Sequence, residues 1–110
     1  MPRVLGPAKA KELIFTAARL SAEEALSEGL VNRVGDSALE TAEALATEML
    51  KCGPLALRAA KRAIDEGGDV GLDDGLQIEQ ACYRTIIPTE DRLEALEAFR
   101  EKRPPNFKGR

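Results

Sequence analysis

The chain has 110 residues, of which 44% are apolar and 32% charged, and its formal net charge is −3. This length allows one domain with a modest core. The slightly acidic balance argues against a nucleic-acid-binding domain, which normally presents a strongly basic surface. No apolar run approaches the roughly 20 residues that a membrane span needs, and no secretory signal opens the chain. We therefore expect neither nucleic acid nor a membrane as a partner.

The absence of histidine narrows the possible chemistry. It excludes Ser-His-Asp and Cys-His nucleophilic catalysis and the common zinc sites that contain histidine. Cys52 and Cys82 lie among apolar residues of predicted helices, without a C-x-x-C spacing. We interpret them as reduced core thiols, with a disulfide or a metal pair as the alternative. The sequence predicts no metal site.

The first 37 residues predict two helices. Pro7, which follows a glycine, is tolerated at the first position of a helix and predicts where the first helix begins. Ser21 heads the run S-A-E-E, which predicts a capping box with Glu24. Gly29 is a suitable left-handed residue to end this short second helix. Residues 30–34 contain the only cluster that favours β-structure, and a brief extended segment is expected there.

Three more helices are predicted in the middle of the chain. Apolar residues recur at helical spacing through residues 39–50. A Gly-Pro pair at Pro54 ends that helix and starts the next, and a glycine-rich loop follows at residues 67–71. A longer helix then covers residues 72–86, until Pro88 breaks it.

The last predicted helix has a start, an apolar face and an end. Thr89 can accept hydrogen bonds from the first free N–H groups, where an acidic Glu-Asp pair adds favourable charge. Its predicted apolar face consists of Leu93, Leu96 and Phe99. The prolines at 104 and 105 are expected to end it. From Lys102 onward there are four basic residues and no acidic one, which favours an anionic partner.

These elements predict an all-α fold of about six helices. The helical faces are rich in alanine and poor in large aromatics, so each face buries little apolar area. We therefore expect the faces to pack on something larger or on copies of the same chain.

Several blocks of the sequence resemble one known family. They are P-R-V-L-G-P-A-K-A-K-E-L-I-F-T at residues 2–16, R-L-S-A-E-E-A-L-S-E-G-L-V-N-R-V at 19–34, G-P-L-A-L-R-A-A-K-R-A-I-D-E-G at 53–67, and E-D-R-L-E-A-L-E-A-F-R-E-K-R-P-P-N-F-K-G at 90–109. In this order they resemble the crotonase superfamily of enoyl-CoA hydratases and isomerases. Residues 78–95 are most similar to its methylglutaconyl-CoA hydratase branch, also called the AU-rich-RNA-binding hydratase branch.

The resemblance implies a position within a larger fold. Residues 1–110 would form the C-terminal helical region of the ClpP/crotonase fold, truncated so that its N-terminal α/β spiral is absent. In this family two glutamates and backbone oxyanion donors perform the chemistry, and those elements would precede residue 1. No residue here inherits a catalytic role. Glutamates such as Glu90 and Glu94 are interpreted as helix-end charges or solvated residues, and the chain is not expected to be active alone.

The same resemblance implies contacts with substrate near the tail. The aromatic residue of the family's A-F position and the lysine of its E-K-R position correspond to Phe99 and Lys102, which would touch the adenine and phosphates of CoA, often on a neighbouring subunit. Arg103 and Lys108 are weaker candidates for the same anion. From the residues alone, Phe99 could instead be a core aromatic and Lys102 a solvated cation.

The implied partners are acyl-CoA, as substrate and not as a resident cofactor, and copies of the chain in a trimer or a dimer of trimers. RNA binding is not expected, because the basic helix of the RNA-binding branch would lie upstream. The expected location is the bacterial cytoplasm, with the mitochondrial matrix as the alternative.

Three functional hypotheses remain. The first is part of a hydratase that adds water to 2-enoyl-CoA thioesters in fatty-acid or branched-chain amino-acid degradation. The second is a non-catalytic helical module for oligomerisation or CoA binding. The third, an unrelated helical adaptor, is disfavoured by the ordered blocks.

Overall fold

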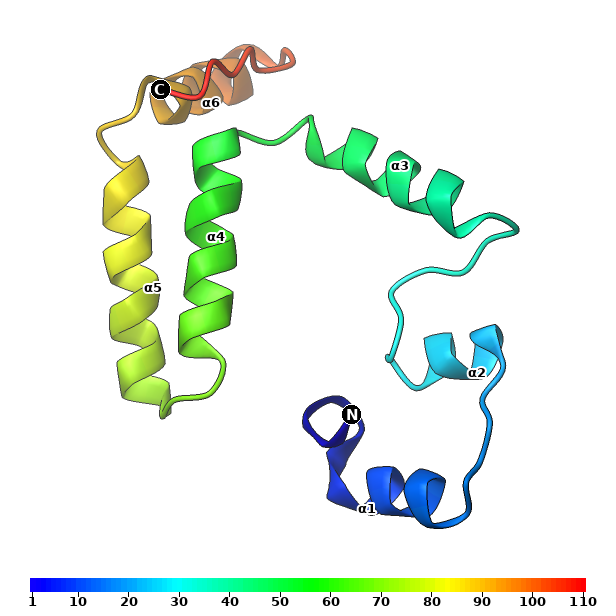
Figure 1. Ribbon diagram of the computed structural model, residues 1–110. Helices are drawn as coiled ribbons and strands as arrows, with labels where there is room; N and C mark the ends of the chain where they lie inside the picture. The colour runs from blue at the N-terminus through cyan, green and yellow to red at the C-terminus, as the bar shows by residue number, and fades with distance from the viewer. The chain divides into compact units, whose positions relative to one another are not determined.

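The computed structural model describes residues 1–110 and contains six helices and no strand (Figure 1). The all-α prediction is confirmed, and residues 30–34 form a loop and not an extended strand. None of the helices is both long enough and apolar enough to cross a membrane. The helices are α1 (Pro2–Phe15), α2 (Ala22–Ser27), α3 (Ala38–Met49), α4 (Pro54–Gly67), α5 (Leu72–Ile86) and α6 (Glu90–Glu101).

The chain forms two compact units, Met1–Ala46 and Thr47–Arg110. In the first unit, α1 is kinked at Gly6, where φ is 76°. Only glycine adopts this conformation readily, so a short helical turn precedes the kink and the regular helix begins at Pro7. The sequence predicted the second helical piece and missed the first. Ala10 and Leu13 are the buried apolar residues of this helix.

Helix α2 begins and ends as the sequence predicts. The Glu24 N–H donates to Ser21 Oγ over 3.1 Å, and the Ser21 N–H donates to Glu24 Oε2 over 2.8 Å, which completes the capping box. At the other end Gly29 has φ 73°, and the Leu30 N–H donates to the Ala25 carbonyl over 2.8 Å. These bonds form a Schellman closure, which satisfies carbonyls that the helix leaves free.

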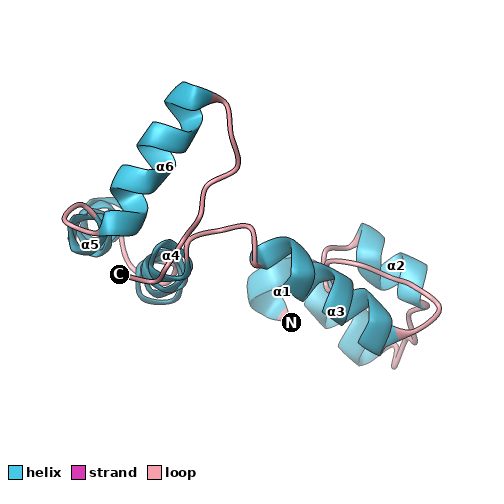
Figure 2. Cartoon of the chain, turned by 90° about the horizontal axis from the view of Figure 1, so that it is seen from above, coloured by secondary structure: helices cyan, strands magenta, loops and turns pink.

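The second unit contains a hairpin of α4 and α5, which lie side by side (Figures 1 and 2). The helices approach closely at two glycines: a Cβ built on Gly75 would lie 3.3 Å from the Gly67 carbonyl oxygen. Cys82 of α5 is buried, as expected, whereas Cys52 is exposed in the turn before α4, contrary to its interpretation as a core residue. Both cysteines are free.

Few side chains are covered within the chain. The apolar residues that are almost fully buried are Ala10, Leu13, Cys82 and Ala98. Larger apolar residues remain exposed, among them Ile64, Leu72 and Phe99. Exposed apolar surface of this extent is typical of faces that other protein covers.

Candidate functional site

The candidate site lies at the last turn of α6. Phe99 is 87% exposed, and Leu93 and Leu96 are 59% and 55% exposed. Within this chain Phe99 is therefore not a core aromatic, and the predicted apolar face of α6 is uncovered. The covered side of α6 is marked instead by Asp91 and Ala98, both buried. Phe99 is thus available for a contact outside the chain.

Lys102 directly follows the helix and ends it. Its backbone is left-handed, with φ 55° and ψ 37°, and the Arg103 N–H donates to the Ala98 carbonyl over 3.0 Å. This is the same Schellman closure that ends α2, and Lys102 occupies the position that Gly29 has there and that usually holds glycine. The helix therefore ends at Glu101, before the prolines that were expected to stop it. The Lys102 side chain is exposed and forms no ion pair within the chain.

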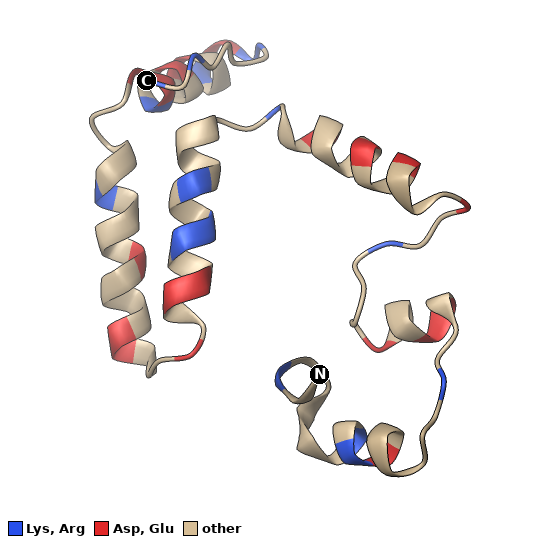
Figure 3. Cartoon of the chain, in the orientation of Figure 1, with Lys and Arg blue, Asp and Glu red and all other residues tan.

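The guanidinium group of Arg103, by contrast, is already paired with two carboxylates. Its Nη1 lies 2.6 Å from Glu94 Oε1, its Nη2 lies 3.2 Å from Glu94 Oε2, and its Nε lies 2.7 Å from Glu101 Oε2. Such bidentate guanidinium–carboxylate pairs are among the stronger polar contacts in proteins. Figure 3 shows basic and acidic residues close together on α6 and the segment after it. Of the two neighbouring cations, Lys102 is the one free to meet an anion.

Glu94 has a second partner besides Arg103. The Asn106 N–H donates to Glu94 Oε1 over 2.7 Å. The hydrogen bonds from Arg103, and then from the Asn106 backbone, lower the pKa of Glu94 from its usual 4.5 to about 2. The same pairing with Glu94 raises the pKa of Arg103. The interpretation of Glu94 as a solvated charge is therefore wrong.

Asp91 holds the end of the chain in a similar way. Its Oδ1 accepts from the Lys108 N–H over 2.6 Å, and its Oδ2 accepts from the Gly109 N–H over 2.8 Å. Its own N–H donates to the Arg110 carbonyl over 2.9 Å. Asp91 is only 5% exposed, so these bonds supply the partners that a buried carboxylate requires. We call Asp91 and Glu94, with the N–H groups that they accept from, the tail clamp.

The clamped segment, residues 104–110, returns along α6 and reaches the start of α4 (Figure 2). A Cβ built on Gly53 would lie 3.5 Å from the Phe107 ring, and one built on Gly109 would lie 3.4 Å from Pro54 Cγ. The backbone of Lys108 is therefore fixed by the clamp, while its side chain stays exposed.

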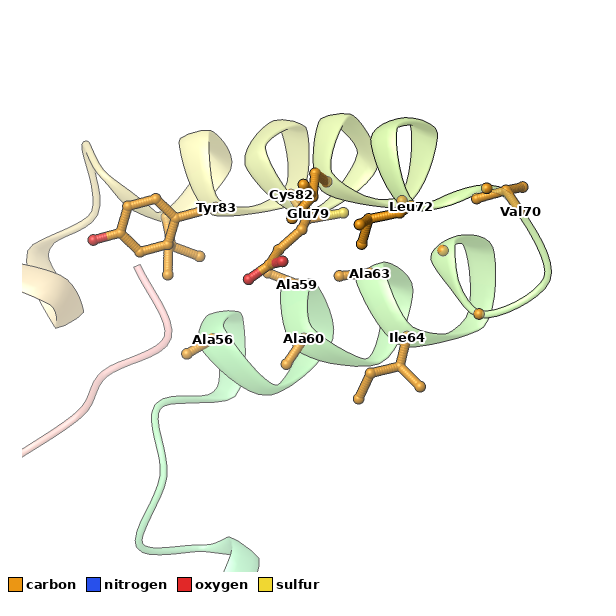
Figure 4. A pocket seen from close by; sticks show the side chains of 16 residues that line it. Ala56, Ala59, Ala60, Ala63, Ile64, Val70, Leu72, Glu79, Cys82 and Tyr83 are labelled. Atoms are coloured by element: carbon orange, nitrogen blue, oxygen red, sulfur yellow. The ribbon is translucent and has the colours of Figure 1, made fainter. Parts of the chain in front are cut away.

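A second hollow surface lies on the α4–α5 hairpin (Figure 4). It has a volume of about 970 Å³ and is open to one side. Its polar side chains are Glu79 and Tyr83, which lie among small and apolar residues. Glu79 is the only carboxylate in this lining and no basic side chain lies beside it there, so the hollow contains no acid–base pair of side chains. Other lining residues are Ala56, Ala59, Ala60, Ala63, Ile64, Leu72, Leu76 and Cys82.

Sequence reasoning identified Phe99, Lys102, Arg103 and Lys108. The structure places the first three at the C-terminal end of α6, whereas the backbone of Lys108 is held by Asp91 in the first turn of the same helix. The reasoning missed the clamp. The two acidic residues of the clamp are three positions apart, but their partners lie up to 18 residues further along the chain, so no local pattern indicates the pairing.

Comparison with known proteins adds a family context. The profile described as Enoyl-CoA hydratase/isomerase matches residues 1–110. Human methylglutaconyl-CoA hydratase, mitochondrial, is 51% identical over 99% of the chain, and human enoyl-CoA hydratase domain-containing protein 2, mitochondrial, is 52% identical over all of it. The crystal structure of enoyl-CoA hydratase from Bacillus anthracis superposes on 99% of the chain with a TM-score of 0.90 and 48% identity. The chain spans 34%, 40% and 43% of these proteins, respectively.

Proposed function

The chain belongs to the enoyl-CoA hydratase/isomerase family, and on that premise we propose that it forms the part of an enoyl-CoA hydratase that closes over acyl-CoA and joins subunits. The reaction of the whole enzyme would be the hydration of 2-enoyl-CoA thioesters. One observation carries the proposal: α6 ends in an exposed ring, Phe99, next to an unpaired cation, Lys102.

The chemistry of these groups matches that of CoA. An aromatic ring can stack on adenine, and an ammonium group can pair with a phosphate. Lys102 is favoured over Arg103, because Glu94 and Glu101 already neutralise the Arg103 guanidinium. Lys108 remains a further candidate, since only its backbone is held.

The test uses a full-length hydratase that carries residues 1–110, called the whole hydratase below. Lys102→Ala should weaken acyl-CoA binding by about 1–2 kcal/mol, the scale of a partly exposed charge-assisted bond. KM should rise more than kcat falls, because a phosphate is remote from the reacting carbons. The difference should shrink at high salt. Lys61→Ala, which removes an exposed lysine of α4, is the matched control. An unchanged KM at low salt would show that Lys102 is only a solvated cation.

We expect no hydratase activity from residues 1–110 alone. Glu24 serves a helix cap and Glu94 the tail clamp, so neither is available as a catalytic base. The assay is hydration of crotonyl-CoA followed by absorbance. Turnover that persists through repurification, and that disappears on substitution of a residue of this segment, would contradict the expectation.

Oligomerisation follows from the exposed apolar faces. Ile64 and Leu72 are 72% and 78% exposed, and they lie beside the open hairpin groove. Burial of such side chains between subunits is favourable. Sedimentation of the isolated chain at micromolar concentration should show a dimer, trimer or larger species, and a monomer with cooperative unfolding would contradict this.

The alternative function is a non-catalytic module that binds CoA or only oligomerises. If the module only oligomerises, substitutions here should alter assembly without altering KM in the whole hydratase. If it binds CoA, the isolated chain should bind CoA on its own. The mitochondrial names of the human relatives favour a mitochondrial location, the alternative given in the sequence analysis.

A further inference from the structure

We propose that Glu94 is a positioning residue for acyl-CoA binding, which holds the chain around Lys102 so that the ammonium group is presented at the end of α6. This inference rests on the proposed function, since it assigns to Glu94 a role in the same contact. Glu94 would act through Arg103 and Asn106 and would not touch the ligand.

The first support is the geometry on both sides of Lys102. On one side Lys102 continues from α6, the helix that carries Glu94. On the other side the next residue, Arg103, is held by both oxygens of Glu94, at 2.6 and 3.2 Å, and the Asn106 N–H is held at 2.7 Å. A single carboxylate thus closes a loop that begins at the helix and contains Lys102.

The second support is the conformation of Lys102. A lysine with φ 55° is in a region that side chains with a Cβ disfavour, so the surrounding contacts must hold it there. The Schellman hydrogen bonds occur at many helix ends and are not specific to this one. The ion pair of Arg103 with Glu94 adds a restraint on the residue that follows directly.

The third support is the distribution of charge. An anion near Lys102 would meet repulsion from a free carboxylate on the same helix. Arg103 pairs with Glu94 through a bidentate contact, which a lysine could not form, and its Nε also pairs with Glu101. Glu94 therefore restrains the loop with its charge paired, and Arg103 is a partner of these carboxylates and not a second anion site.

The experiment is a double-mutant cycle in the whole hydratase, with acyl-CoA KM and kcat measured at low salt. Glu94→Gln keeps the shape and an acceptor oxygen but loses the charge. We expect it to raise KM about fivefold, with little change in kcat, because a remote binding contact is affected. In the Lys102→Ala background the same change should alter KM by less than about twofold, because the two residues act in one contact.

Glu97→Gln is the matched control, since Glu97 lies on the same helix and contacts only the exposed Arg100, at 3.5 Å. It should leave KM unchanged. If Glu94→Gln does not fold, Arg103→Lys serves instead, because it keeps the charge and loses the bidentate geometry. Faster hydrogen exchange at the Asn106 amide should accompany the rise in KM for either variant.

The outcomes separate the two proposals. If Lys102→Ala leaves KM unchanged, the proposed contact with acyl-CoA fails, and the role of Glu94 fails with it. If Lys102→Ala raises KM but neither Glu94→Gln nor Arg103→Lys does, only the positioning role is overturned. If Glu94→Gln raises KM equally with and without Lys102, the effect is general to the fold and the positioning role is also overturned.

Discussion

The α4–α5 hairpin and the α6 tail lie in the same unit, yet each is stabilised by a different kind of interaction. The hairpin depends on small residues: Gly67 and Gly75 let the backbones of α4 and α5 approach closely, and alanines line the α4 side. The tail depends on charge, because Asp91 and Glu94 accept hydrogen bonds from a returning segment. The hairpin should therefore respond to changes in side-chain size, and the tail to changes in charge.

The largest effect is expected from removal of the buried carboxylate of the clamp. Asp91→Ala leaves the Lys108 and Gly109 N–H groups without acceptors, which should cost about 2–3 kcal/mol of local stability. Hydrogen exchange in the whole hydratase should show loss of protection at these two amides. Asp91→Asn, which keeps one acceptor oxygen, should lose less. Unchanged protection in Asp91→Ala would mean that the clamp does not hold the tail.

The hairpin should lose stability when a larger side chain is placed at the close approach of its two helices. Gly75→Val places a branched side chain where even a Cβ would be 3.3 Å from the Gly67 carbonyl oxygen, and overpacking of this kind costs about 1–3 kcal/mol. Thermal or denaturant unfolding measures the loss. Gly67→Ala is the control, since its Cβ would have ordinary contacts at 3.7 Å. Equal stability of the two variants would show that close approach at Gly75 is unimportant.

A smaller effect separates backbone strain from charge at the end of α6. Lys102→Gly relieves the left-handed conformation and should raise stability by up to about 1 kcal/mol, after the added chain entropy of glycine is counted. Ala17 ends α1 with φ 50° and the same closure, so Ala17→Gly should stabilise similarly. Only Lys102→Gly should also raise the KM for acyl-CoA. A rise in KM with Ala17→Gly would attribute the effect to the fold and not to the cation.

The smallest effect concerns pH. Because the pKa of Glu94 falls from 4.5 to about 2 on folding, its stabilising contribution is complete above about pH 4.5 and is lost as pH falls toward 2. Arg103 pairs with it directly and Lys108 adds a favourable charge nearby. The chemical shift of the Asn106 amide should therefore stay constant from about pH 5 to 8. A transition within that range would contradict the ion pair.

The sequence predicted features whose partners are close along the chain. Ser21 and Glu24 are three residues apart, as are Thr89 and the Arg92 N–H that it caps. Helical spacing showed that Leu93 and Leu96 share a face, but spacing cannot tell which face other atoms cover. For this reason the sequence left open whether Phe99 is a core aromatic or an exposed one.

The remaining features depend on contacts across longer separations. The partners of Asp91 lie 17 and 18 residues away, and nothing in the local pattern pairs them. The prolines correctly indicated a helix end, yet the left-handed Lys102 ends the helix earlier. Residue types alone could nominate Lys102 and Arg103 equally, and only the structure shows that Arg103 is already paired.

The most direct test of the central claim is a crystal structure of the whole hydratase with bound acyl-CoA. The account predicts the Phe99 ring against the adenine, Lys102 Nζ within about 3 Å of a phosphate oxygen, and Glu94 still paired with Arg103. A structure in which Phe99 packs only against protein, and the Lys102 ammonium lies in solvent away from the CoA, would contradict it.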